Sequence, residues 1–159
     1  MRALLLSLLL VLPACSAQSA QPTPTPAAQP SVHPVSGLPV VPLTVTTTGN
    51  RTHAFRVEVA STPQQQARGL MFRTAMGPDE GMIFPYAQPQ VLSFWMKNTV
   101  LSLDIVFIGP DRRVINVADH AVPYSEASLT SDAPAIAVLE LNAGRAAELG
   151  IVGGSKVDW

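Results

Sequence analysis

The distribution of proline limits how this chain folds more than any other feature. The chain contains 15 prolines, and the segment Ser16–Pro42 consists mainly of Pro, Ala, Gln, Ser and Thr. Proline lacks the backbone N–H that helices and sheets need, so such a segment is predicted to stay extended or disordered. We therefore interpret residues 15–42 as a tether, in which His33 has no expected role. One folded domain is expected over residues 43–159, enough for a single core.

The N-terminus is typical of an export signal. Arg2 supplies a positive charge, and Ala3–Leu12 is a leucine-rich apolar run that is too short to span a bilayer. Residues 1–14 are therefore interpreted as a signal peptide. The run ends in Leu12-Pro13-Ala14-Cys15, which resembles the lipobox of bacterial lipoproteins.

Cys15 is the single cysteine of the chain, so it has no partner for an internal disulfide. Lipidation of its thiol would explain its presence and attach the protein to a membrane. The alternative is an ordinary secretory signal with a chance cysteine. Ser16 follows Cys15, and by resemblance to enterobacterial sorting rules this favours the periplasmic face of the outer membrane.

Charge argues against one class of partner. The formal net charge is -1, and the lysines and arginines are scattered along the sequence. Nucleic-acid binding needs a dense basic patch that releases counterions from phosphates. We expect no nucleic-acid partner. The expected partners are the membrane, through lipid on Cys15, and an envelope protein, wall component or small molecule.

Alternating apolar residues and frequent turn signals predict a mainly-β domain, either a barrel or a sandwich of short antiparallel strands with two short helices. Thr62 is expected to cap the first helix, with Gln65 as its capping-box partner. Val91–Met96 is apolar on both faces and predicts a central, doubly buried strand. The other predicted elements are a hairpin over 43–59, strands at 82–85, 100–108, 114–117, 135–141 and 156–158, and a helix at 145–149.

Several of these segments, taken in order, resemble a known family. They are Phe55–Ala60, Arg68–Arg73, Gly81–Phe84, Ser93–Thr99, Leu103–Ile105, Val138–Glu140 and Ala143–Gly144. Together they are similar to domain-of-unknown-function family 192, small bacterial and archaeal proteins that often carry signal peptides. Ser102 departs from this pattern, because proline is common there in the family. The resemblance implies a compact, mainly-β fold and supplies no activity or catalytic set.

Six polar residues form the candidate functional cluster: Lys97, Asn98, Asp104, Glu140, Arg68 and Arg73. Asp104 and Glu140 lie in apolar strands, and a buried charge is costly unless it is paired. Lys97, Arg68 or Arg73 would provide that pairing. One interpretation is a cleft where Lys97 and a carboxyl group bind or protonate a ligand. The other is a structural ion pair, with Asn98 at a tight turn.

Other candidate sites have weaker support. Four methionines, with His53 or His120, would suit Cu(I), although their spacing forms no metal motif and methionine commonly fills cores; they are Met71, Met76, Met82 and Met96. Phe94 and Trp95 form either an aromatic wall for a ligand or part of the core. No metal or cofactor is expected.

The sequence offers little for nucleophilic hydrolysis, because residues 43–159 contain no cysteine and no Gly-x-Ser-x-Gly elbow. We therefore expect an exported envelope lipoprotein with a small binding or structural domain. The alternatives are a small hydrolase that uses Asp104 or Glu140 with Lys97, and a methionine-based copper-binding protein.

Overall fold

The structure is a computed structural model that describes residues 31–159. Within this range there are ten strands and two helices. The strands are β1 (Ser31–Val32), β2 (Pro39–Thr46), β3 (Thr52–Val59), β4 (Glu80–Gln90), β5 (Ser93–Phe94), β6 (Leu103–Ile108), β7 (Val114–Ala121), β8 (Leu129–Thr130), β9 (Ala135–Asn142) and β10 (Lys156–Asp158). The helices are α1 (Pro63–Arg68) and α2 (Arg145–Leu149).

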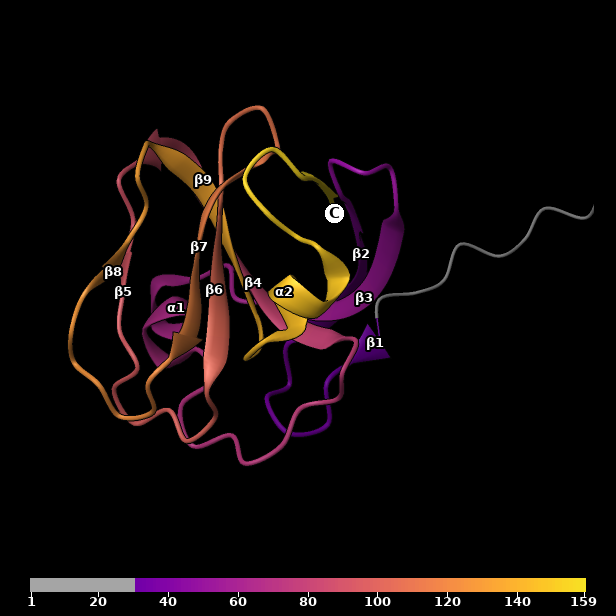
Figure 1. Ribbon diagram of the computed structural model, residues 1–159. Helices are drawn as coiled ribbons and strands as arrows, with labels where there is room; N and C mark the ends of the chain where they lie inside the picture. The colour runs from indigo at the N-terminus through magenta and orange to yellow at the C-terminus, as the bar shows by residue number, and fades with distance from the viewer. Residues whose placement is uncertain (1–30) are drawn as a thin grey trace, which may run out of the picture.

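The prediction of a mainly-β fold with two short helices is confirmed, and the arrangement is sandwich-like without a closed barrel. The larger sheet has the order β1-β2-β3-β4-β9-β6-β7, with β10 also paired to β2. β5 and β8 form a separate two-stranded sheet. In Figure 1 this small sheet lies on the opposite side of the molecule from β2 and β3.

One strand pair differs from the predicted antiparallel arrangement. β3 and β4 are parallel, because α1 carries the chain back between them. The start of α1 follows from its sequence. The Thr62 side chain accepts a hydrogen bond from the Gln65 backbone N–H, and the Gln65 side chain accepts one from the Thr62 backbone N–H, which confirms the capping box.

Three central strands have two buried faces: β6, most of β9, and β4 over Gly81–Phe84. In β6, Val106 and Ile108 belong to a first core shared with β2 and β3, while Ile105 and Phe107 belong to a second core shared with the segment that follows α1. Successive side chains of a strand point to opposite faces, so the buried apolar residues of these strands enter one core or the other.

The prediction for Val91–Met96 is wrong. Only Ser93 and Phe94 are in a strand, and β5 is not central, because its one partner is β8. Leu92 and Met96 are buried, whereas Val91 and Trp95 have exposed fractions of 63% and 47%. The apolar composition thus reflects a segment with one buried face and one face that presents large apolar side chains to solvent.

The sheet includes residues before position 43, where the folded domain was expected to begin. β2 starts at Pro39 and pairs with β3 from Val40 onward. On its other edge β2 pairs with β1 and β10 along only part of its length, so this strand accommodates proline. The predicted signal peptide, Cys15 and the first part of the tether fall outside the described residues. Neither helix in residues 31–159 is long and apolar enough to cross a membrane.

Gly81 provides a test of how closely β4 and β9 pack. A Cβ atom at this position would lie 2.5 Å from the Glu140 carbonyl oxygen and 3.1 Å from Leu141 Cδ2. Both strands are packed between the two cores at this point, so they cannot move apart to admit a methyl group. Gly81→Ala should therefore lower the free energy of unfolding by about 1–3 kcal/mol, as overpacking does.

Urea denaturation would measure this effect. Gly49→Ala is the matched control, because a Cβ atom there meets only Thr47 Oγ1, at 3.8 Å. Equal stability of the two variants would contradict the close contact of β4 with β9.

Candidate functional site

The candidate site centres on Glu140, whose position follows from the alternation of β9. Leu139 and Leu141 point into the first core, so Glu140 points to the opposite side, with Val138. Its cross-strand neighbours are Met82 on β4 and Ile105 on β6. The sheet pairing therefore holds this carboxyl group at the centre of the protein.

Glu140 borders an open cleft of about 270 Å³. The cleft is lined by Gln66–Met71 from α1 and the turn after it, by Phe84 and Tyr86 from β4, by Ser93–Trp95, and by Thr99 and Glu140. This volume is near the lower limit of small-molecule sites, so the cleft suits a small ligand or one unit of a larger ligand.

Aromatic side chains give the cleft a fixed shape. The rings of Phe84 and Phe94 are 5.0 Å apart at 86°, and Phe94 meets Phe107 in a similar edge-to-face contact. Gly69 allows the turn after α1 to approach, because a Cβ atom there would lie 3.3 Å from Phe84 Cζ. Gly69 also has φ of 48°, which favours glycine.

Glu140 lacks a partner in its buried position. Its side chain takes part in none of the hydrogen bonds or ion pairs found within residues 31–159, and its Oε2 atom is fully buried. Burial raises the pKa of Glu140 to about 8, because the charged form is poorly solvated there. The group is therefore protonated at neutral pH and presents one donor and one acceptor.

Tyr86 lies within electrostatic reach of this carboxyl group. The pKa of Tyr86 is raised, first by its own burial and second by the charge that Glu140 carries at high pH. Both groups are thus neutral at pH 7. The cleft combines uncharged polar groups at its buried end with aromatic walls.

Asp104 has a different role from the one expected. It is fully buried, and its carboxylate accepts hydrogen bonds from the backbone N–H groups of His120, Gly144 and Ala146, at 2.9–3.0 Å. These bonds connect β6 to β7 and to the start of α2. The expected pairing of Asp104 with a basic side chain is not present, because the main chain satisfies the carboxylate instead.

The basic members of the predicted cluster are also separated. Lys97 pairs with Glu126 at 3.5 Å and lies 5.0 Å from the centre of the Trp95 ring. Arg68 lines the cleft. Asn98 lies in the turn that precedes β6, where it has φ of 54° and its carbonyl accepts the Phe72 N–H. Of the predicted cluster, the structure therefore brings only Arg68 to the cavity that Glu140 borders.

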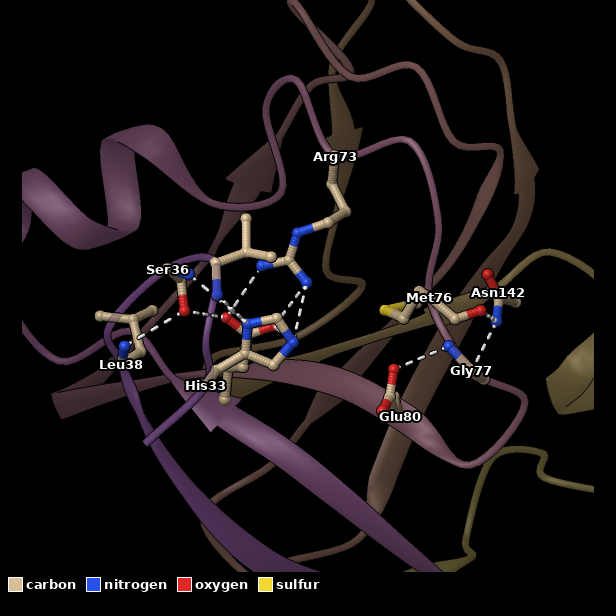
Figure 2. Close-up of polar contacts among 10 residues, drawn as sticks. His33, Ser36, Leu38, Arg73, Met76, Gly77, Glu80 and Asn142 are labelled. Atoms are coloured by element: carbon tan, nitrogen blue, oxygen red, sulfur yellow. Dashed lines mark hydrogen bonds and ion pairs between the residues drawn. The ribbon is translucent and has the colours of Figure 1, made fainter. Parts of the chain in front are cut away.

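Arg73 belongs to a second polar cluster, shown in Figure 2. Its guanidinium donates two hydrogen bonds to the buried Glu58 carboxylate, at 2.8 and 3.0 Å. The Ser36 hydroxyl also donates to Glu58, and His33 Nε2 lies 3.7 Å from it. His33 is thus part of the folded domain, where this cluster fixes the segment between β1 and β2 against β3.

The right-hand part of Figure 2 shows how the loop before β4 is held. The Asn142 side-chain amide donates to the carbonyls of Met76 and Gly77, at 3.1 and 2.9 Å. The Gly77 N–H donates to the Glu80 carboxylate at 2.7 Å. These contacts fix the loop beside β9 and involve no group of the cleft.

The methionines follow the core interpretation. Met82 and Met96 are buried in the second core, and Met76 packs against it. Met71 is half-buried on the cleft wall, where its sulfur lies 3.9 Å from Asn98 Nδ2. Within residues 31–159, no group of three or more His, Cys, Asp or Glu side chains is placed to hold a metal ion.

The sequence analysis did not single out Tyr86 or Phe84, although a signal was present. The two residues are two positions apart in one strand, so alternation places them on the same face. Trp95, expected either in a wall or in the core, lines the cleft with an exposed fraction of 47%, whereas Phe94 both packs against the core and lines the cleft.

The buried Glu140 predicts a pH-dependent stability. The unfolded chain releases this proton near pH 4.5, whereas the folded chain keeps it up to about pH 8. Between these values the folded state binds more protons, so the free energy of unfolding attributable to this group falls as pH rises, by about 1.4 kcal/mol per unit at most. Glu140→Gln removes this dependence.

Denaturation of wild type and Glu140→Gln from about pH 5 to about pH 10 would check this. The stability gained by the variant should grow with pH and level off above pH 8. Glu126→Gln, at an exposed position, serves as the control. A constant difference between wild type and Glu140→Gln would mean that Glu140 is ionised in the folded protein.

Comparison with known proteins places this fold in a family. A crystal structure of a protein of unknown function from Novosphingobium aromaticivorans DSM 12444 is 57% identical, with a TM-score of 0.80, and the match covers 84% of this chain and 94% of that chain. A structure from Sinorhizobium meliloti 1021, described as a candidate transcription regulator, is 41% identical, with a TM-score of 0.72 and coverage of 74% and 91%.

The comparison with curated proteins gave no match. The profile of family DUF192, described as an uncharacterized ACR, matches residues 43–159. This range contains the cleft, Glu140 and most of both cores. The chain therefore belongs to the DUF192 family.

Proposed function

We propose that this protein is an exported, lipid-anchored binding protein whose DUF192 domain takes a ligand in the Glu140 cleft. One observation carries the binding role: a buried, protonated carboxyl group without a hydrogen-bond partner borders an open cavity with aromatic walls. An unpaired polar group in such a place costs folding free energy of about 1–3 kcal/mol. A ligand that pairs with Glu140 would recover it.

The charge state of the cleft indicates the kind of group that binds at its buried end. Neutral Glu140 offers an O–H donor and a carbonyl acceptor, which match an amide or a hydroxyl group of a ligand. Tyr86, Phe94 and Trp95 would contact the apolar part of the ligand. Binding would exclude water from this end of the cleft and strengthen the hydrogen bonds between the ligand and Glu140.

Export and anchoring rest on residues 1–15, where an apolar run ends at Cys15. The remaining residues before β1 are rich in proline and would separate the domain from the lipid. The proposed location is the periplasmic face of the outer membrane, where the partner would be an envelope protein, a wall component or a small molecule.

A hydrolase is the second candidate, and one feature favours it. A general acid at neutral pH needs a carboxyl group with a raised pKa in an open cleft, and Glu140 satisfies this condition. Glycosidases use a pair of carboxyl groups. Glu140 is the single carboxyl group among the residues that line the cleft in the described part of the chain. Binding is therefore the better-supported function.

Fragment binding tests the site. A library of uncharged amide and hydroxyl fragments, screened by NMR, should shift the signals of Tyr86, Phe94 and the Trp95 indole. Affinity should fall about tenfold per pH unit above pH 8, because Glu140 then loses the proton that it donates. Tyr86 keeps its proton in this range because its pKa is raised above 10.

Glu140→Gln should bind independently of pH, and Glu140→Ala should lose at least tenfold in affinity. Hits that shift signals elsewhere, or that bind Glu140→Ala unchanged, would contradict the proposed site. Glu140→Gln that still turns over a hydrolysable substrate would exclude Glu140 as a general acid.

Anchoring is tested separately. Cys15→Ser removes the thiol that would carry the lipid, so the variant should move from the membrane fraction to the soluble fraction of the envelope. Cell fractionation with an antibody to the domain measures this distribution. Ser16→Ala is the control for a change beside the cysteine. Membrane retention of Cys15→Ser would contradict lipid anchoring.

A further inference from the structure

A second cavity adjoins the Glu140 cleft. It has a volume of about 380 Å³ and shares Arg68, Gly69 and Met71 with the first cavity as lining residues. The C-terminal end of α1 and the turn after it therefore separate two hollows that share a wall. A ligand longer than one small molecule could occupy both.

The second cavity has one apolar side, and polar residues line the rest of it: Ser36, Gln64, Gln65, Arg68 and Arg73. Leu38 is buried on its wall, and Val35 and Phe72 line it with exposed fractions of 75% and 62%. Phe72 has φ of 62°, a left-handed conformation that is rare for a bulky residue. Its N–H donates to the Asn98 carbonyl at 2.9 Å, which holds the backbone in this state. The fold thus keeps a strained, exposed aromatic residue beside the cavity.

Arg68 lies between the two hollows. It is exposed, and none of the ion pairs found within residues 31–159 includes it. One other arginine, Arg73, lines the second cavity, and its charge is neutralised by Glu58. A free cation at this point complements an acidic group on a bound chain.

The Glu140 cleft also contains an open sheet edge. β5 pairs with β8 alone in the part of the chain that the structure describes, and both residues of β5, Ser93 and Phe94, line the cleft. Unpaired strand edges accept extended polypeptides, whose main chain supplies hydrogen bonds while the side chains enter pockets. The neutral carboxyl group of Glu140 is complementary to an amide, donating to its C=O and accepting from its N–H.

We infer that the ligand is an extended polypeptide segment of a partner protein that spans both cavities. An amide of the segment pairs with Glu140, an acidic side chain meets Arg68, and an apolar side chain enters the cavity beside Phe72. This inference rests on the proposed binding role of the Glu140 cleft. The apolar side of the second cavity, formed by Val35, Leu38 and Phe72, favours a polypeptide over an oligosaccharide, because a sugar chain has no large apolar side group to place there.

The test uses a random heptapeptide library displayed on phage and selected on the full chain in detergent. Selected peptides should share an acidic residue and a large apolar residue at a fixed spacing. Synthetic copies of these peptides, measured by calorimetry, should lose at least tenfold in affinity with Phe72→Ala. Arg68→Gln should weaken the acidic peptide, and replacing the acidic residue of the peptide by its amide should then have little further effect.

Tyr124→Ala is the matched control for Phe72→Ala. Tyr124 is also an exposed aromatic residue, with an exposed fraction of 61% and φ of 61°, and it lines neither cavity. Affinity should be unchanged in this variant. Circular dichroism melting curves of both variants show whether each remains folded.

The possible outcomes separate this inference from the proposed function. If selected peptides need Glu140 but are indifferent to Phe72→Ala and Arg68→Gln, the ligand stays in the first cleft and the two-cavity inference is wrong. If no peptide is enriched while fragments bind the cleft, or if oligosaccharides bind and need Phe72, the polypeptide assignment is wrong. If Glu140→Ala changes neither fragment nor peptide binding, both proposals fail.

Discussion

The pairing of β9 with β4 and β6 is the constraint on which the rest of the structure depends. β6, most of β9 and the segment Gly81–Phe84 of β4 are buried on both faces, so their side chains have no route to bulk solvent except through a cavity. In β6 and β9, neighbouring positions alternate between two cores. A polar residue in either strand must find a partner inside the protein or lose its charge.

Asp104 and Glu140 show the two outcomes of that constraint. In the register of β6 against β9, Asp104 is opposite Leu141 and Ile105 is opposite Glu140. The two acidic side chains therefore point to opposite faces of the sheet. The Asp104 carboxylate accepts hydrogen bonds from three backbone N–H groups and stabilises the fold. The Glu140 side chain accepts no such hydrogen bond, stays protonated and borders a cleft, which makes it available to a ligand.

The surroundings of Glu140 give this cleft its chemical character. α1 and the turn after it form one wall, and the segment from β5 to Trp95 forms another. Arg68 at the end of α1 and Phe72 in the turn after it line the neighbouring cavity, so one short region of the chain shapes both hollows. Arg73, four residues after Gly69, is neutralised by Glu58 and secures the segment between β1 and β2, which closes the second cavity on its far side. Fold and candidate site are thus built by the same contacts.

The sequence by itself determined the local elements, because these depend on near neighbours: the capping box at Thr62, the hairpin of β2 and β3, and most strand positions. It also carried the family resemblance and identified Glu140 as a residue that needed explanation. It could not separate Glu140 from Asp104, since their faces depend on strand register. Nor could it pair Arg73, in the segment between α1 and β4, with Glu58 of β3. The apolar segment around Trp95 was misinterpreted for a similar reason. Composition shows that large apolar side chains are present, but only the packing of β5 against β8, with one edge left open, decided that Trp95 lines a cleft.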